Sequence, residues 1–213
     1  MEQTPLESGN EAEARLLESA LKIFSEKGYE GTSIREIIEG AGVTRPVLYY
    51  YFQNKEDLFR RLVEPLFNEF IAGLDQVPDL YADCLGRLKA VMRMTFDYSE
   101  RYPLTIRLVF QMYFSPPQCG PKMDKSAFRR KRFQVVERIV REGLEQGDLA
   151  GGDAQSLALV FVGIMDTHIM AKGQMPGIRL TTELAEGLVD LFYYGACFKD
   201  IPMTALVSPF RYV

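Results

Sequence analysis

Apolar side chains recur at steps of three and four residues along most of the chain, whereas the alternation typical of strands is almost absent. That spacing gathers them on one face of a helix with 3.6 residues per turn. We therefore expect an all-α fold. Beyond three N-terminal helices, the pattern predicts helices over 55–74, 82–99, 103–113, 122–146, 153–172 and 181–199.

The first helix is expected to run from about Asn10 to Lys27, with Gly28 in position for the left-handed turn that often ends a helix. Its expected core stripe consists of Ala14, Leu17, Leu21 and Phe24. The helix that starts after Asn54 should kink or break at Pro65, because proline removes a backbone hydrogen bond and crowds the preceding turn. Residues 76–80 are expected to form a linker.

Two short helices between these long ones are joined by a tight turn. The side chain of Thr32 or Ser33 can accept a hydrogen bond at the start of the second helix, and the Gly-Ala-Gly stretch at 40–42 ends it. The third helix runs from about Arg45 to Phe52 and has Pro46 in its first turn, where a missing N–H is tolerated. This arrangement is typical of a helix-turn-helix.

In such a motif the third helix enters the major groove with its first residues at the base edges. With Leu48 facing the core, Tyr50 points most directly outward. Arg45 can make a bidentate contact to guanine, and Pro46 or Val47 can touch a thymine methyl group. Tyrosine hydroxyls in the same helix suit phosphate oxygens, which position a protein without reading sequence.

Three N-terminal stretches resemble the DNA-binding domain of TetR-family regulators. They read Gly-Tyr-Glu-Gly-Thr-Ser-Ile-Arg-Glu-Ile-Ile at 28–38, Ala-Gly-Val-Thr-Arg-Pro-Val-Leu-Tyr-Tyr-Tyr-Phe at 41–52 and Asn-Lys-Glu-Asp-Leu-Phe at 54–59. The glycines, the Leu-Tyr-x-x-Phe core and the Lys-Glu-x-Leu stretch that begins the fourth helix fall at the family's spacing. The likeness covers about 11–63.

The resemblance implies a set of DNA contacts. Ser33 and Arg35 match positions on the bracing helix that contact phosphate or an adjacent base, and Lys55 matches a lysine that holds a phosphate. The corresponding positions of the recognition helix are Thr44, Arg45, Val47, Tyr49 and Tyr51, and Pro46 and Tyr50 complete the DNA-facing set. Tyr51 stands where the family often has histidine, and its helical position lies nearer the core side.

Composition provides no bulk attraction to DNA, since the net charge is −4 and residues 1–61 carry 8 basic and 11 acidic side chains. Only the stretch 44–61 is basic, with four basic side chains against two acidic ones. Affinity must therefore come from a few placed contacts.

Three widely spaced cysteines form neither a disulfide framework nor a zinc-ligand spacing, and they suit a reducing cytoplasm. Common enzyme motifs are absent, and the single histidine, His168, has no acid–base partner in the sequence. We expect no catalytic residues, no metal and no cofactor. The apolar stretch 156–171 is short for a membrane span and contains Asp166, so we expect a buried helix and no membrane association.

The C-terminal part is expected to hold a ligand, because aromatic and methionine side chains commonly line apolar pockets between helices. The expected lining residues are Phe67, Met92, Phe96, Phe110, Phe133, Phe161, Met165 and His168. Ordinary core packing is the first interpretation for most of them, and a hydrogen-bonded position in the core is the default for His168, with a contact to the ligand as its alternative.

The last two helices carry more apolar surface than one contact face requires. The expected dimer interface consists of Leu184, Leu188, Leu191, Phe192 and Gly195. Helix-turn-helix proteins commonly bind two half-sites as two-fold dimers, so we expect a four-helix bundle between two copies. Burial within one chain is the alternative.

The expected organisation is a flexible tail over 1–10, a three-helix DNA-binding domain with the helix-turn-helix over 11–55 and a helical effector-binding and dimerisation domain over 56–213. The expected function is transcriptional repression, with a small apolar or amphipathic effector releasing a homodimer from palindromic double-stranded DNA. A helical ligand-binding or protein-interaction module without DNA binding is the alternative, and it predicts no salt-dependent binding to DNA.

Overall fold

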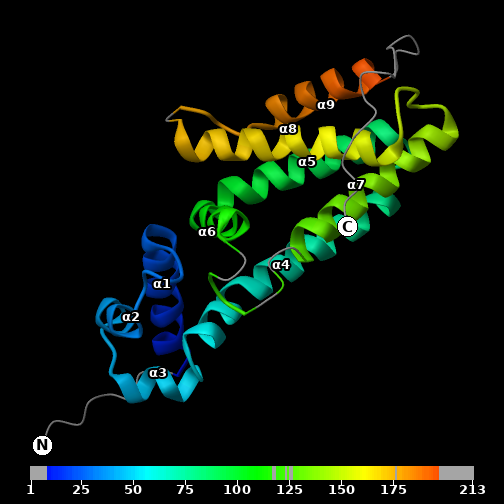
Figure 1. Cartoon of the computed structure of the whole chain (residues 1–213). Coiled ribbons are helices and arrows are strands. Elements are labelled where there is room, and N and C mark those ends of the chain that lie inside the picture. The colour runs from blue at the N-terminus through cyan, green and yellow to red at the C-terminus, as the bar shows by residue number, and fades with distance from the viewer. Residues whose placement is uncertain (1–8, 117–118, 123, 125–126, 176, 197–213) are drawn as a thin grey trace, which may run out of the picture. The chain divides into compact units, whose positions relative to one another are not determined.

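The computed structural model describes residues 9–116, 119–122, 124, 127–175 and 177–196, and within this part of the chain every regular element is a helix (Figure 1). The helices are α1 Gly9–Lys27, α2 Ile34–Ala41, α3 Arg45–Tyr51, α4 Lys55–Leu80, α5 Cys84–Arg101, α6 Pro103–Phe114, α7 Ala127–Gln146, α8 Ala154–Gln174 and α9 Thr182–Ala196. The all-α prediction is confirmed. Of the expected tail, residues 9 and 10 already belong to α1, and residues 1–8 lie outside the described part.

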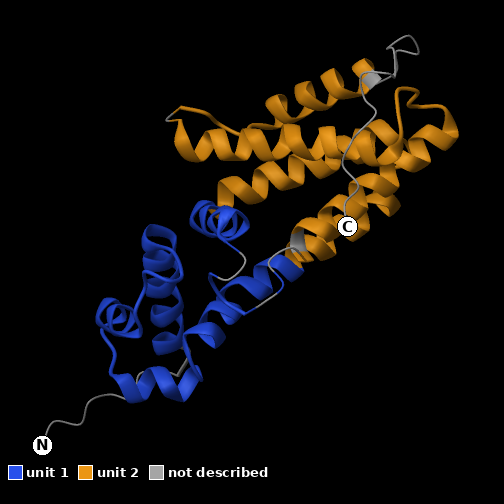
Figure 2. Cartoon of the chain, in the orientation of Figure 1, with its two compact units in different colours: residues 1–68, 103–125 blue, residues 69–102, 126–213 orange. Residues whose placement is uncertain are grey.

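The chain forms two compact units (Figure 2). Unit 1 takes its described residues from 1–68 and 103–125, and unit 2 takes them from 69–102 and 126–213. Helix α6, although it follows α5 in sequence, therefore belongs to the same unit as α1, α2 and α3. The functional division at residues 55 and 56 remains a prediction.

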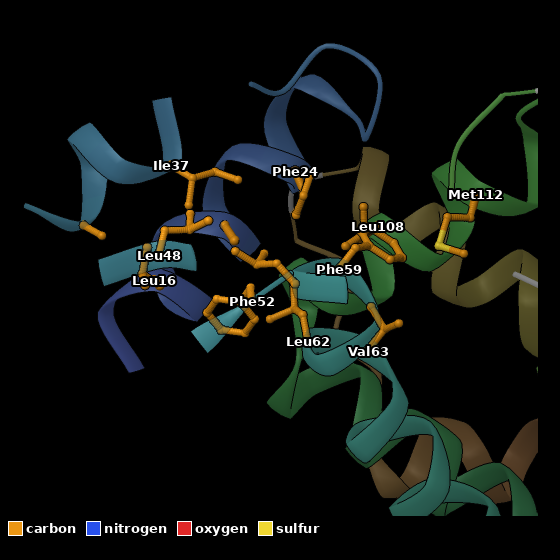
Figure 3. Close-up of a cluster of buried hydrophobic side chains, with 13 residues drawn as sticks. Leu16, Phe24, Ile37, Leu48, Phe52, Phe59, Leu62, Val63, Leu108 and Met112 are labelled. Atoms are coloured by element: carbon orange, nitrogen blue, oxygen red, sulfur yellow. The ribbon is translucent and has the colours of Figure 1, made fainter. Parts of the chain in front are cut away.

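Unit 1 is held together by one apolar cluster (Figure 3). The side chains of Leu48 and Phe52 are fully shielded from solvent in this cluster, which anchors the inner face of α3 as the sequence predicts. Helix α6 contributes Leu108 and Met112 to the same cluster. The position of α3 is thus set by long-range packing as well as by its own sequence.

The buried face of α1 differs from the predicted stripe. Phe24 is buried as expected, but Ala14 is exposed, and Leu17 and Leu21 only flank the cluster. The fully shielded apolar residues of α1 are Leu16, Ala20 and Phe24. The prediction was wrong by a rotation of the helix, because α1 packs against α2, α3 and α6 together rather than against one neighbour.

Helix α4 runs without a break from Lys55 through Pro65 and on through Pro78 to Leu80. The predicted linker over 76–80 is therefore wrong, and of the predicted kink or break at Pro65 the break is excluded. Burial of Phe70, Leu74 and Val77 on one face of the helix explains the continuation. Tertiary packing of such a stripe outweighs the local preference against proline.

Unit 2 consists of the last part of α4 with α5, α7, α8 and α9. Helix α5 packs against α9, and α7 packs against α8. Ion pairs cross both contacts: Arg93 to Glu186 at 3.0 Å joins α5 to α9, and Arg132 to Asp166 at 2.6 Å joins α7 to α8. Helix α7 begins at Ala127, later than the predicted residue 122.

Helix α8 is apolar on more than one side. By length and composition alone it is the one described helix that could cross a membrane, with a mean hydropathy of 1.4 and only 33% of that window buried. On its inner face Asp166 forms an ion pair with Arg132, whose side chain is 4% exposed. Its outer face leaves Leu159 and Val160 each 48% exposed. The predicted buried helix is therefore buried on one face only.

Candidate nucleic-acid interface

The N-terminus of α2 is capped by side chains at its own start. Ser33 occupies the N-cap position, and its Oγ accepts a hydrogen bond from the backbone N–H of Glu36 at 3.2 Å. The Glu36 carboxylate in turn accepts from the Ser33 N–H and from the Ser33 hydroxyl, each at 2.8 Å. This reciprocal capping box satisfies two orphan donors of the helix, and it already uses the Ser33 hydroxyl that the sequence assigns to DNA.

Glu36 also receives a cation. Lys27, in the last turn of α1, donates to its carboxylate at 2.5 Å. Together with the two hydrogen bonds from Ser33, this contact lowers the pKa of Glu36 from 4.5 to about 2. The spacing Ser33-x-x-Glu36 is a known signature of a helix start, so the sequence contained this pair although the predicted cap did not include Glu36.

The turn after α2 depends on glycine at two positions. Gly42 has a φ of 63°, in the left-handed region that glycine adopts without strain. At Gly40 an added Cβ would lie 2.4 Å from the Oγ of Ser19 in α1. The same Oγ donates to the backbone carbonyl of Ile37 at 3.0 Å, so α1 and α2 are in direct contact here. The predicted glycine turn is confirmed.

The start of α3 is organised differently. Thr44 is its N-cap residue, yet the threonine side chain makes no capping hydrogen bond. Pro46 in the first turn has no N–H to satisfy. The exposed Thr44 hydroxyl and the remaining backbone N–H groups at this end therefore stay available to an outside acceptor such as a phosphate.

The three tyrosines of α3 differ in exposure. Tyr50 is 82% exposed and Tyr49 is 45% exposed, whereas Tyr51 packs partly against the core of unit 1. The Tyr51 ring also meets the Tyr50 ring edge-on, with 4.9 Å between their centroids. Tyr49 and Tyr50 thus share the outward surface with Pro46, and Val47 is half-buried beside them.

Arg45 lies at the exposed entry of α3. Its guanidinium carbon is 5.5 Å from the centroid of the Tyr49 ring, and its Nη2 is 3.5 Å from the Tyr49 hydroxyl. Of the basic side chains between residues 27 and 61, all of which the structure describes, only Arg45 and Lys55 have no carboxylate within ion-pair distance. Arg35, for example, pairs with Glu39 at 2.7 Å while its side chain stays 87% exposed.

Lys55 is tied to the turn between α1 and α2. Its ammonium group donates to the backbone carbonyls of Tyr29 at 2.8 Å and Thr32 at 2.9 Å. It also lies 4.3 Å from the centroid of the Tyr29 ring. An ammonium group has three donors, so one remains for a further acceptor. The sequence predicts only the phosphate contact of Lys55, because this structural role depends on contacts across 23 and 26 residues.

The residues predicted to line a ligand pocket are divided between the units. Phe67 packs against the core of unit 1, and the Phe110 ring stacks on Phe114 in the same unit. Four of the predicted residues in unit 2 have at most 1% exposure, namely Met92, Phe96, Phe161 and Met165. Phe133 is half-buried in α7, and the pocket assignment as a whole remains a prediction.

The structure does bring one pair of the predicted pocket residues together. The rings of Phe96 and His168 lie 6.3 Å apart, and His168 Nδ1 donates to the backbone carbonyl of Ile164 at 2.7 Å. His168 is thus hydrogen-bonded, as its default interpretation expects, but it is half-buried rather than fully in the core. Its other ring nitrogen has no role assigned by this geometry.

The predicted dimer residues separate into two groups. Leu191 is 72% exposed, Gly195 is exposed, and Leu184 and Leu188 are half-buried. Phe192, in contrast, is only 6% exposed and packs edge-on against Phe161 with centroids 5.3 Å apart. Phe192 therefore belongs to the core of its own unit, because its position in α9 faces α8 rather than solvent.

The helix-turn-helix region of this chain is similar to known proteins. The profile of "Bacterial regulatory proteins, tetR family" matches residues 16–62. The negative transcriptional regulator IcaR of Staphylococcus epidermidis is 34% identical over 102 residues, which cover 48% of this chain and 54% of IcaR. The chain thus spans about half the length of that relative.

Two further comparisons extend beyond the helix-turn-helix. The uncharacterized HTH-type transcriptional regulator YfiR of Bacillus subtilis is 34% identical over 150 residues, covering 67% of this chain and 70% of YfiR. The structure of FadR from Bacillus subtilis in complex with stearoyl-CoA has a TM-score of 0.70 at 20% identity, covering 85% of this chain and 98% of that one. The likeness to the FadR structure shows that the helical fold is shared over 85% of this chain.

Proposed function

The chain belongs to the TetR family of DNA-binding transcriptional regulators, and from that premise we propose that it is a homodimeric, cytoplasmic repressor released from a palindromic operator by a small ligand. The observation that carries the proposal is the open start of α3. Arg45 stands there without a carboxylate partner, beside an uncapped helix end and two exposed tyrosines. The relatives reported above are described as regulators, in keeping with a protein that has no catalytic role.

In this proposal the two helices of the motif divide the work. Arg45 reads a guanine, Pro46 and Val47 touch base methyl groups, and Thr44 and the tyrosines hold phosphates. On α2, Arg35 reaches the backbone from an exposed position.

In the proposal, Ser33 and Lys55 contribute to DNA binding mainly by fixing the position of α2. Ser33 keeps α2 capped. Lys55 keeps its two carbonyl bonds and offers its third donor to a phosphate.

The outer faces of α8 and α9 support the proposed homodimer. Leu159, Val160 and Leu191 are large apolar side chains with about half or more of their surface exposed. Apolar faces on two neighbouring helices are what a two-fold four-helix bundle between copies would cover. The proposed interface keeps Leu184, Leu188, Leu191 and Gly195 and no longer includes Phe192.

The proposed effector is apolar or amphipathic. A TetR-like fold can accept such a molecule, as the FadR complex with stearoyl-CoA illustrates for that protein. In unit 2 the fully shielded Met92, Phe96, Phe161 and Met165 would have to separate to admit it. Methionine adapts well to such repacking.

The test is fluorescence anisotropy with a labelled duplex from the region upstream of the protein's own gene, at several salt concentrations. The wild type is expected to bind with a steep salt dependence, because phosphate contacts release counterions. The R45A/Y49A variant is expected to lose about 10-fold or more in affinity, since one bidentate base contact is worth about 1–3 kcal/mol.

Two outcomes would reject parts of this proposal. Arg138, exposed on α7, provides the control R138A, which removes the same charge outside the motif and should bind as the wild type does. Undiminished binding by R45A/Y49A would reject the assigned surface. A wild type without salt-dependent binding would favour the helical module that does not bind DNA.

A further inference from the structure

Two exposed arginines of the helix-turn-helix are held by different kinds of partner. Arg35 on α2 and Arg45 on α3 each contact the side chain four residues further on, at the spacing that brings neighbours together on one helix face. The Arg35 Nε lies 2.7 Å from a carboxylate oxygen of Glu39. The guanidinium carbon of Arg45 lies 5.5 Å from the centroid of the Tyr49 ring. One arginine is thus paired with a charge and the other with an aromatic ring.

These partners leave different amounts of charge for an outside acceptor. The Glu39 carboxylate offsets the charge of Arg35, whereas a tyrosine ring attracts a guanidinium through its electron-rich face without neutralising it. In the described part of the chain, no carboxylate lies within ion-pair distance of Arg45. Arg45 therefore keeps its full charge, while the ring limits the positions that its guanidinium can take.

Tyr49 is a firmer support than the next tyrosine along α3. Tyr49 is 45% exposed, so more than half of it is covered by the protein, whereas Tyr50 is 82% exposed. The preceding residue, Leu48, is fully shielded, and its N–H donates to the Thr44 carbonyl at 3.2 Å. The Tyr49 hydroxyl is 3.5 Å from Nη2 of Arg45, which is long for a hydrogen bond. The ring therefore makes the main contact, and the hydroxyl stays available.

The orientation of an arginine matters when it reads guanine. Its N–H donors form a rigid planar fork, which must be aligned with the base edge to reach O6 and N7 together. An exposed arginine otherwise samples many rotamers, and fixing it on binding costs conformational entropy. A partner that restricts the side chain beforehand lowers that cost.

We propose that Tyr49 is a positioning residue whose ring holds the Arg45 guanidinium in the orientation that reads guanine. This inference rests on the proposed function, in which Arg45 is the base reader. Ring and hydroxyl of Tyr49 then have separate tasks. The ring sets the preference for guanine, and the hydroxyl contacts a phosphate and adds affinity for any sequence.

The experiment uses the full-length protein and the labelled duplex from the region upstream of its own gene. Single guanines are replaced in turn by 7-deazaguanine, which has a C–H group in place of the N7 acceptor. The wild type should bind about 5-fold or more weakly when the guanine read by Arg45 is replaced, because one bond of the bidentate contact is lost. R45A should bind that duplex and the natural one equally.

Variants of Tyr49 then separate its ring from its hydroxyl. Y49F should keep the wild-type ratio of the two affinities, although it binds both duplexes more weakly. Y49L removes the ring and should reduce the ratio about 2- to 5-fold, as expected for an exposed contact between a cation and a ring. Y49Q gives the same comparison if Y49L does not fold. The control Y50L removes the more exposed ring and should weaken binding to both duplexes equally.

A measurement without DNA follows the contact itself. In NMR spectra, the Hδ protons of Arg45 should show the ring-current shift of an aromatic neighbour in the wild type and in Y49F. The shift should be lost in Y49L, because no ring then lies beside the guanidinium. Equal Hδ shifts in the wild type and Y49L would mean that the contact does not form in solution, and would overturn the inference.

The DNA measurements distinguish this inference from the proposed function. A wild type that binds DNA, together with a Y49L variant that keeps the wild-type ratio, would overturn the positioning role alone. A wild type that binds no duplex would reject the DNA-binding surface and the positioning role together.

Discussion

The starts of α2 and α3 differ in how their free backbone N–H groups are satisfied. Helix α2 is closed by Ser33 and Glu36, and Lys27 compensates the charge of the cap. Helix α3 has a threonine at the equivalent position that makes no cap bond, a proline in its first turn and an arginine with no carboxylate partner. The first helix end is complete within the protein, whereas the second has donors left over.

In the proposed function, this difference accounts for DNA binding by an acidic chain. Helix α2 must keep its position whether or not DNA is present, so the free backbone N–H groups at its start are satisfied within the protein. A reading helix gains affinity from donors that are satisfied only in the complex, provided that its inner face is firmly packed. Leu48 and Phe52 supply that packing.

The largest effect is expected from removing the packing that holds α3. Phe52 is fully buried, and F52A should lower the free energy of unfolding by about 3–5 kcal/mol, because it removes a large core side chain and leaves a cavity. Urea denaturation measures this loss. Y50A, at a position 82% exposed on the same helix, should change stability by less than about 0.5 kcal/mol. Similar losses in the two variants would mean that α3 is not anchored as described.

A smaller effect is expected at the link between α4 and the α1–α2 turn. K55M removes two charge-assisted hydrogen bonds to backbone carbonyls and should cost about 1.5–3 kcal/mol of stability. Thermal unfolding against K22M, which removes an exposed lysine of α1, checks the result. A K55M protein as stable as K22M would mean that Lys55 serves the phosphate only.

The smallest effect concerns the charge of the α2 cap. The pKa of Glu36 is about 2 in the folded chain against an ordinary value of 4.5, so its ionised form stabilises the fold. That contribution is complete above pH 4.5 and is lost as the pH falls towards 2. Urea midpoints of wild type and E36Q should therefore differ at pH 7 and converge between pH 4.5 and 2. A difference that does not change with pH would contradict the role of the charge.

The local signals in the sequence predicted the helix-turn-helix well. Gly42 permits the positive φ of the turn and Pro46 fixes φ in the first turn of α3, so both features could be placed from residue type alone. The exposure of Tyr50 followed from the position of Leu48. Glu36 was overlooked although the capping-box spacing was present.

Features set by distant contacts were not predictable in the same way. The face of α1, the passage of α4 through Pro65 and Pro78, and the membership of α6 in unit 1 all depend on which elements meet in space. The same holds for the hydrogen bonds of Lys55 to the backbone carbonyls of Tyr29 and Thr32. Periodicity identifies apolar faces, but it does not say which neighbour covers each face, as Phe192 shows.

The central claim is that the start of α2 serves folding and the start of α3 serves DNA. The most direct test measures stability and DNA affinity for S33A and T44A in parallel. S33A should lose about 1 kcal/mol of unfolding free energy, because it loses its cap. T44A should unfold as the wild type does and bind the DNA more weakly at every salt concentration. A T44A variant that is destabilised as much as S33A, with unchanged DNA affinity, would contradict the claim.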